Sequence, residues 1–151
     1  MTLNIQVFSD VICPWCLVGK RRLERALDEL GLRAETAITW LPFELNPDMP
    51  EGGMPRVEYR ARKFGPERAA SLDADMTRLG REEGIAFRFD RQTRTPSTRL
   101  AHVALAFAAG QGRGDALKEA LMSAYFEAGA DVGDPAVLID LAAGVGLRAT
   151  L

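Results

Sequence analysis

The stretch "SDVICPWCLVGKRRLERAL", residues 9–27, contains both cysteines of the 151-residue chain, Cys13 and Cys16. Before it, apolar and polar residues alternate over residues 3–9, which predicts a β-strand. After it, apolar residues recur at helical spacing, and Pro14 suits a first helical turn because its missing N–H costs nothing there. The first cysteine is therefore expected where a strand ends and a helix begins.

The rest of the chain separates into a second strand and a long helical region. Residues 34–41 alternate again, so strand, helix and strand form a βαβ unit whose two strands should be parallel. Residues 46–55 read as a loop, and residues 85–90, "IAFRFD", as a short extended segment. Helices are predicted at about 57–64, 66–83, 97–109, 114–127 and 135–143. The fold class is therefore expected to be α/β.

A sheet of two strands is too small to be stable by itself. The sequence offers a βαβ unit over residues 1–45, followed by a mostly helical region over residues 46–151. Either the helices cover the small sheet completely, or further strands follow Leu151.

Composition and charge exclude several classes of function. The formal charge of −2 gives no reason to expect binding to nucleic acid or to an anionic membrane surface. The N-terminus has neither the basic nor the apolar segment of a signal peptide, and no apolar run is long enough to span a bilayer. We therefore expect a cytoplasmic protein, in which stable structural disulfides are rare.

The position of the two cysteines suggests redox chemistry. Free N–H groups and the helix dipole favour an anion at a helix N-terminus, and such a site lowers the pKa of cysteine from about 8.5 to about 3.5–7.5. Cys13 is the predicted nucleophile toward a substrate disulfide, and Cys16, one turn further on, would resolve the mixed disulfide. Pro14 stiffens the link, and Trp15 offers an apolar surface beside the sulfur.

Three polar residues outside the pair each have two interpretations. Asp10, just before the motif, is either a turn residue or a carboxylate that raises the thiol pKa or relays a proton to Cys16. Asn46, after the second strand, either caps a loop or contacts the backbone of glutathione or a peptide. His102 is either a packed or half-exposed helical residue, which is the expectation because nothing in the sequence places it near Cys13, or a proton shuttle.

Zinc binding and inert packing are the alternative roles for the cysteine pair. A zinc site would need two further ligands, and His102 is the single histidine of the chain, so no metal is expected. Two inert, packed cysteines remain an alternative, because free cysteine is often buried. However, C-x-x-C beside a βαβ pattern is typical of thioredoxin-like redox proteins.

"FSDVICPWCLVGKRRLE" followed by "WLPFELNPDMP" resembles the DsbA-like thioredoxin-fold family, and within it the FrnE-like cytoplasmic branch. The later stretches "TPSTRLAHVALAFA" and "ALMSAYFEAGADVGDPAVLIDLAAGVGL" resemble the helical insertion of that branch. The resemblance implies a thiol–disulfide oxidoreductase with a thioredoxin-like fold and a helical insertion. Its partners would be protein or small-molecule disulfides and thiols, and it would need no cofactor beyond the redox-active disulfide.

The same superfamily includes kappa-class glutathione transferases and 2-hydroxychromene-2-carboxylate isomerases. These similar proteins typically have serine at the position of Cys13 and activate glutathione instead of attacking with a protein thiol. Cys13 and Cys16 together favour the dithiol function. A glutathione-dependent isomerase or transferase remains the alternative, and glutathione is a candidate co-substrate in either case.

The chain departs from the family pattern at its C-terminal end. The family continues past the insertion with a cis-proline and further strands, whereas this sequence stops at Leu151. Residues 1–45 would then be the N-terminal half of a thioredoxin-like domain and residues 46–151 its helical insertion, with the C-terminal strands missing. We expect such a chain to expose a strand edge and to be poorly stable or to self-associate.

Overall fold

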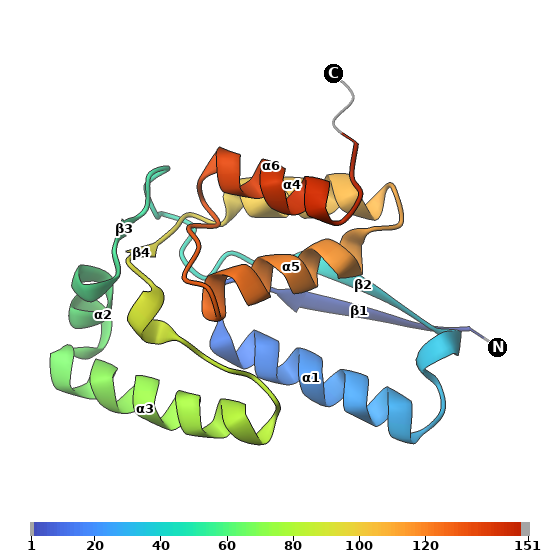
Figure 1. Ribbon diagram of the computed structural model, residues 1–151, viewed down its shortest axis with the longest axis horizontal. Helices are drawn as coiled ribbons and strands as arrows, with labels where there is room; N and C mark the ends of the chain where they lie inside the picture. The colour runs from blue at the N-terminus through green and yellow to red at the C-terminus, as the bar shows by residue number, and fades with distance from the viewer. Residues whose placement is uncertain (1, 149–151) are drawn as a thin grey trace.

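The computed structural model describes residues 2–148 as a parallel strand pair followed by a helical region (Figure 1). The strand pair with its crossover helix comprises β1 (Leu3–Ser9), α1 (Pro14–Glu29) and β2 (Thr36–Pro42). The later elements are β3 (Met54–Pro55), α2 (Arg56–Phe64), α3 (Pro66–Glu82), β4 (Arg94–Thr95), α4 (Arg99–Ala109), α5 (Gly114–Phe126) and α6 (Pro135–Gly144). The α/β class and the predicted helices are confirmed to within a few residues.

β1 and β2 pair in parallel, as the βαβ pattern predicts. Their register runs from Leu3 opposite Thr36 to Ser9 opposite Pro42. The second strand begins two residues later than predicted because a 3₁₀ turn at Arg33–Glu35 comes first. Among the described residues, β1 has no strand on its other side.

Helix α1 is fixed to its neighbours by ion pairs as well as by apolar packing. Its Arg22 and Arg25 both contact Glu83, just after α3, at 2.9 Å and 2.8 Å. On another side of the helix, Arg21 pairs with Glu119 of α5. These contacts hold the helix that follows the cysteines between α3 and α5.

Helices α4, α5 and α6 pack together as one block, drawn above the strand pair in Figure 1. Helix α5 is the centre of the core, and its fully buried side chains include Leu117, Leu121, Met122 and Phe126. No helix in the part of the chain that the structure describes is long and apolar enough to cross a membrane. The assignment of residues 1–45 and 46–151 to a thioredoxin-like half and an insertion stays a prediction.

The segment 85–90, which was expected to be extended, forms no strand. Ile85 and Phe87 are buried, so the alternation in the sequence does mark an inward face. Phe87 stacks on Phe89 at a centroid distance of 5.1 Å and meets Phe126 edge to face at 5.3 Å. Aromatic packing therefore replaces sheet hydrogen bonds in this connection between α3 and α4.

A short antiparallel contact between β3 and β4 was not foreseen. Met54 pairs with Thr95, and Gly53 precedes it with a φ of 71°, in the left-handed region. A Cβ atom on Gly53 would lie 2.6 Å from the Thr95 carbonyl oxygen, so a side chain there would prevent this close approach. The contact connects the loop before α2 to the segment before α4.

Candidate active site

The cysteine pair lies at the N-terminus of α1, where the sequence places it. Cys13 is the N-cap residue, Pro14 opens the helix, and the Cys16 N–H donates to the Cys13 carbonyl oxygen at 3.0 Å. Both thiols are free and half-buried, and the Trp15 side chain is 58% exposed. The predicted strand-to-helix position and the outward-facing Trp15 are confirmed.

The two thiols share one negative charge. The Cys13 thiol donates a hydrogen bond to the Cys16 sulfur, which lowers the pKa of Cys16 to about 6 despite burial. The Ser9 hydroxyl, the Asp10 backbone and the charge of Lys118 act in the same direction. The same hydrogen bond and burial raise the pKa of Cys13. The two thiols therefore titrate as a coupled pair, and one proton crossing this hydrogen bond moves the charge from one sulfur to the other.

Asp10 connects three parts of the fold behind the cysteines. Its buried carboxylate accepts from the Val11 N–H at 2.8 Å and from the Leu45 N–H, in the loop after β2, at 2.7 Å. The His102 Nε2 of α4 lies 3.1 Å from the same carboxylate. Burial alone raises the pKa of Asp10, but hydrogen bonds from His102, Leu45 and Thr98 hold it below the usual range. Asp10 thus stays ionised and fixes the loop that leads to Cys13.

His102 is a packed residue of α4, as expected, but it lies closer to the cysteine loop than the sequence indicates. Its Nε2 lies 3.1 Å from the Asp10 carboxylate and 3.1 Å from the Phe43 carbonyl oxygen. Both neighbours are acceptors, so Nε2 carries a hydrogen and donates to them. His102 and Asp10 are 92 positions apart, and no local pattern in the sequence connects them. It is three-dimensional packing of α4 that brings His102 behind the cysteine loop.

A cavity of about 470 Å³ opens beside Cys13. Cys13, Pro14 and Trp15 line one side of it, while Cys16 does not line it. The remaining lining comes mostly from α2, α3 and the aromatic core: Ile12, Leu45, Arg56, Tyr59, Arg60, Lys63, Phe64, Arg68, Leu72, Asp73, Asp75, Met76, Leu79, Phe89, Gln92, Thr95, Tyr125 and Phe126. A ligand in this cavity would therefore meet the Cys13 sulfur and not the Cys16 sulfur.

The cavity wall carries both paired and unpaired cations. Arg56 and Arg60 both contact Asp73, at 2.9 Å and 2.7 Å. Within residues 2–148, Lys63 and Arg68 have no carboxylate within 4.0 Å. The charge of this wall is thus positive, on a lining that is otherwise largely apolar.

Asn46 is connected to the edge of the cavity by a hydrogen bond from Tyr59. The Tyr59 hydroxyl, which lines the cavity, donates to the Asn46 Oδ1 at 2.8 Å. The Asn46 Nδ2 is buried and has no hydrogen-bond partner among the described residues. Contact between Asn46 and a ligand stays a prediction. No group of three metal-binding side chains converges anywhere in the described part of the chain.

A CxxC pair at the N-terminus of a βαβ crossover helix defines a thioredoxin-like protein, and the comparisons identify the family. The chain belongs to the DSBA-like thioredoxin domain family, which it matches over residues 4–151. A probable DsbA oxidoreductase of Streptomyces coelicolor, SCO1869, is 32% identical with a TM-score of 0.87. The alignment covers 97% of this chain and 64% of that protein.

Two other proteins are similar over nearly the whole chain. The uncharacterized Bacillus subtilis protein YwbO is 29% identical over 97% of this chain and 68% of its own length. The cytosolic disulfide reductase DsbM of Pseudomonas aeruginosa, solved with GSH, has a TM-score of 0.60 at 23% identity, over 96% of this chain and 66% of DsbM. At that identity the DsbM comparison supports the fold. The chain spans about two thirds of the length of these proteins.

Proposed function

We propose that this chain carries the cysteine pair of a thiol–disulfide oxidoreductase, with Cys13 as nucleophile and Cys16 as resolving thiol. The observation that carries the proposal is the difference in exposure to the cavity. Cys13 lines the cavity beside Trp15, whereas Cys16 faces the packed interior. Membership of the DSBA-like family supports the same chemistry.

The reaction begins when the proton shared by the pair moves to Cys16. The Cys13 thiolate then attacks one sulfur of a substrate disulfide, which breaks the substrate S–S bond and releases one substrate thiolate. Cys16 loses its proton and attacks the Cys13 sulfur, which forms the Cys13–Cys16 disulfide and releases the second thiol. The substrate gains two electrons and the cysteine pair loses two, and the reverse sequence oxidises a substrate dithiol.

Replacing each cysteine in turn tests these roles. Cys13→Ser should abolish insulin reduction or disulfide transfer, because no second thiol lines the cavity. Cys16→Ser is the matched variant, and it should stop turnover but still form a mixed disulfide on Cys13, detected by intact-protein mass spectrometry. Unchanged activity of Cys13→Ser would refute the proposal.

A glutathione-dependent isomerase or transferase is the second candidate function. The unpaired Lys63 and Arg68 beside an apolar cavity suit a ligand with an apolar body and carboxylate groups, and glutathione carries two carboxylates. The DsbM structure with GSH adds support. Tight glutathione binding that survives Cys16→Ala would favour this candidate, and loss of binding in that variant would favour the dithiol function.

The finer family assignment and the cellular location are also proposals. The sequence resemblance favours the FrnE-like branch, and the description of DsbM as a cytosolic disulfide reductase supports a cytoplasmic location. Fractionation of cells that express the chain without added targeting segments tests the location. Recovery in the membrane or export fraction would contradict it.

A further inference from the structure

Lys118 of α5 is a buried ammonium group without a hydrogen-bond partner. Its exposed fraction is 0%, and its Nζ finds no acceptor among the described residues. The Nζ lies 5.5 Å from the centre of the Trp40 ring, which offers only a cation–π contact. Such burial is costly unless an anion compensates it.

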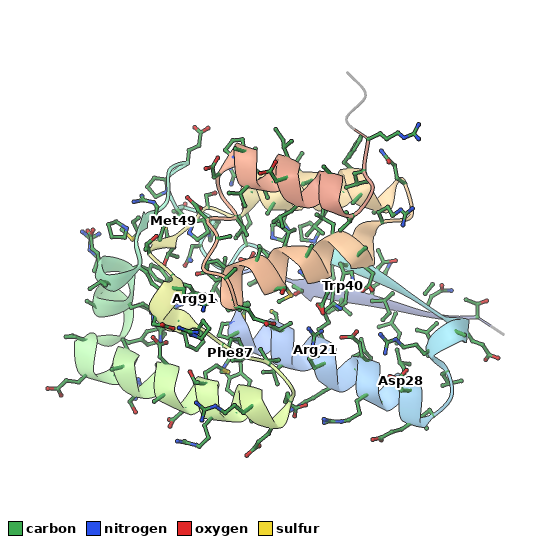
Figure 2. The ribbon with its side chains drawn as sticks, in the orientation of Figure 1. Arg21, Asp28, Trp40, Met49, Phe87 and Arg91 are labelled. Atoms are coloured by element: carbon green, nitrogen blue, oxygen red, sulfur yellow. The ribbon has the colours of Figure 1, made fainter. Side chains whose placement is uncertain are left out.

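Lys20 of α1 provides an internal comparison. Its Nζ lies 5.7 Å from the centre of the same Trp40 ring, and it is also buried. However, Lys20 lies 3.4 Å from Glu24, 3.7 Å from Asp115 and 3.5 Å from Glu119. Both lysines thus lie near one ring, but carboxylates neutralise Lys20 and not Lys118. Figure 2 shows Trp40 beside α5.

The geometry of α1 places Lys118 on the Cys16 side of the pair. Lys20 follows Cys16 by four residues, so the two side chains share one face of α1, and Trp40 bridges that face to Lys118. The groups that act electrostatically on Lys118 are Cys16, Asp10, Lys20 and Cys13, with Cys16 the strongest of them. On α5 itself, Asp115 and Glu119 are engaged by Lys20 and Arg21.

We propose that Lys118 is a positioning residue for the resolving step, in which its buried ammonium stabilises the Cys16 thiolate that attacks the mixed disulfide. This inference rests on the proposed oxidoreductase function. Cys16 loses its proton, its sulfur forms the bond to the Cys13 sulfur, and the Cys13–substrate bond breaks. The leaving substrate thiolate keeps the bonding pair and takes up a proton from solvent.

The expected effect on rate follows from two opposing factors. Each pH unit by which the Cys16 pKa rises cuts the thiolate fraction tenfold at a pH below that pKa. A more basic thiolate is also about threefold more nucleophilic, so the net loss is about threefold per unit. Loss of the Lys118 charge should therefore slow resolution about threefold to tenfold and should leave the attack by Cys13 almost unchanged.

The test follows the two steps separately in the full 151-residue chain. One equivalent of an aromatic nitrobenzoate disulfide releases one coloured thiolate when Cys13 attacks and a second when Cys16 resolves. At pH 6, Lys118→Met should slow only the second release, whereas Lys118→Arg, which keeps the charge, should restore it. Lys20→Met, which removes the other buried ammonium, should change the second release by less than twofold.

The outcomes distinguish this inference from the proposed function. Absence of the first release in the unmodified chain would refute the oxidoreductase function itself. A normal first release with an equal second release in Lys118→Met would overturn only the role of Lys118. The difference between Lys118→Met and the unmodified chain should also shrink above pH 9, because burial lowers the pKa of Lys118 to about 8 and its charge is then lost.

A measurement on the unmodified chain covers the case in which Lys118→Met does not fold. The Lys118 side-chain nitrogen is titrated by NMR in the reduced and the oxidised protein. The midpoint should be lower in the oxidised protein, because the disulfide removes the thiolate that holds the proton on Lys118. Equal midpoints in the two forms would overturn the inference.

Discussion

The interior behind the cysteines and the exposed faces of β1 and α4 reverse the usual distribution of residue types. Behind the cysteines, Asp10, Lys20 and Lys118 are almost completely buried. On the outside, Phe8 of β1 is 69% exposed, and Val103 of α4 is 61% exposed. Charges are normally found outside and large apolar residues inside.

The two reversals have different causes. Lys118 acts electrostatically on the thiol pair, and Asp10 holds the loop before the pair in place. The exposed apolar side chains belong to β1, which has no strand on one side among the described residues, and to one face of α4, where Leu100, Val103 and Phe107 follow each other at helical spacing. The buried charges behind the cysteines are thus typical of a reactive site, and the exposed apolar residues of β1 and α4 are typical of a contact surface.

The largest stability effect is expected at Lys118. Lowering its pKa from about 10.5 to about 8 costs the folded chain about 3 kcal/mol, at about 1.4 kcal/mol for each pH unit. Lys118→Met should therefore raise the free energy of unfolding by up to this amount below pH 8. The gain should shrink between pH 8 and about 10.4, where the unfolded chain still holds the proton that the folded chain has lost.

Urea unfolding at several pH values measures this effect. Lys118→Arg serves as the control, because it keeps a buried charge and should give no gain. A Lys118→Met chain that is less stable than the unmodified chain at pH 7 would contradict the view that this charge is kept for function at the expense of stability.

A smaller loss of stability is expected at Asp10. Asp10→Ala leaves the Val11 N–H and the Leu45 N–H without their acceptor, which should lower the free energy of unfolding by about 2 kcal/mol. Asp48→Ala, at an exposed carboxylate in the same region of the chain, is the matched control and should change little. Equal stabilities of the two variants would contradict the linking role of Asp10.

Acid should lower the free energy of unfolding through the same residue, Asp10. The pKa of Asp10 is lowered in the folded chain, so its contribution is fully present above about pH 4, the pKa of an unfolded aspartate. That contribution is lost as the pH falls through the lowered folded-state pKa. In Asp10→Asn, the free energy of unfolding should fall less steeply as the pH is lowered. An identical pH dependence in the two chains would contradict this contribution of Asp10.

The exposed apolar surface should have little effect on folding and a clear effect on association. Val103→Ser should change the free energy of unfolding by less than about 0.5 kcal/mol, because the side chain is mostly in water. It should reduce the self-association that we expect of the unmodified chain at micromolar concentration, as measured by analytical ultracentrifugation. A monodisperse unmodified chain would refute that expectation.

The sequence predicts the βαβ unit and the position of the cysteines because both depend on local pattern. It does not predict the packing of Phe87, because an alternating segment looks the same whether its partners are strands or aromatic rings. The sequence also does not predict that Phe43, an aromatic residue just after β2, is 53% exposed, because burial of a loop residue depends on what packs over it.

The surroundings of the cysteines were predictable only in part. Trp15 and Pro14 follow from helix geometry. The contacts of His102 and Lys118 depend on how α4 and α5 pack against β2, and no spacing in the sequence encodes that packing. In the sequence, nothing distinguishes Lys118 from a surface lysine of a helix.

The central claim is that two thiols three residues apart differ in role, with Cys13 facing the ligand and Cys16 facing the interior. Alkylation of the reduced chain with a limiting amount of iodoacetamide at pH 7, followed by peptide mass spectrometry, tests it directly. The label should appear on Cys13 first, because Cys13 lines the cavity and Cys16 does not. Labelling of Cys16 first, or of both thiols at equal rates, would contradict the account.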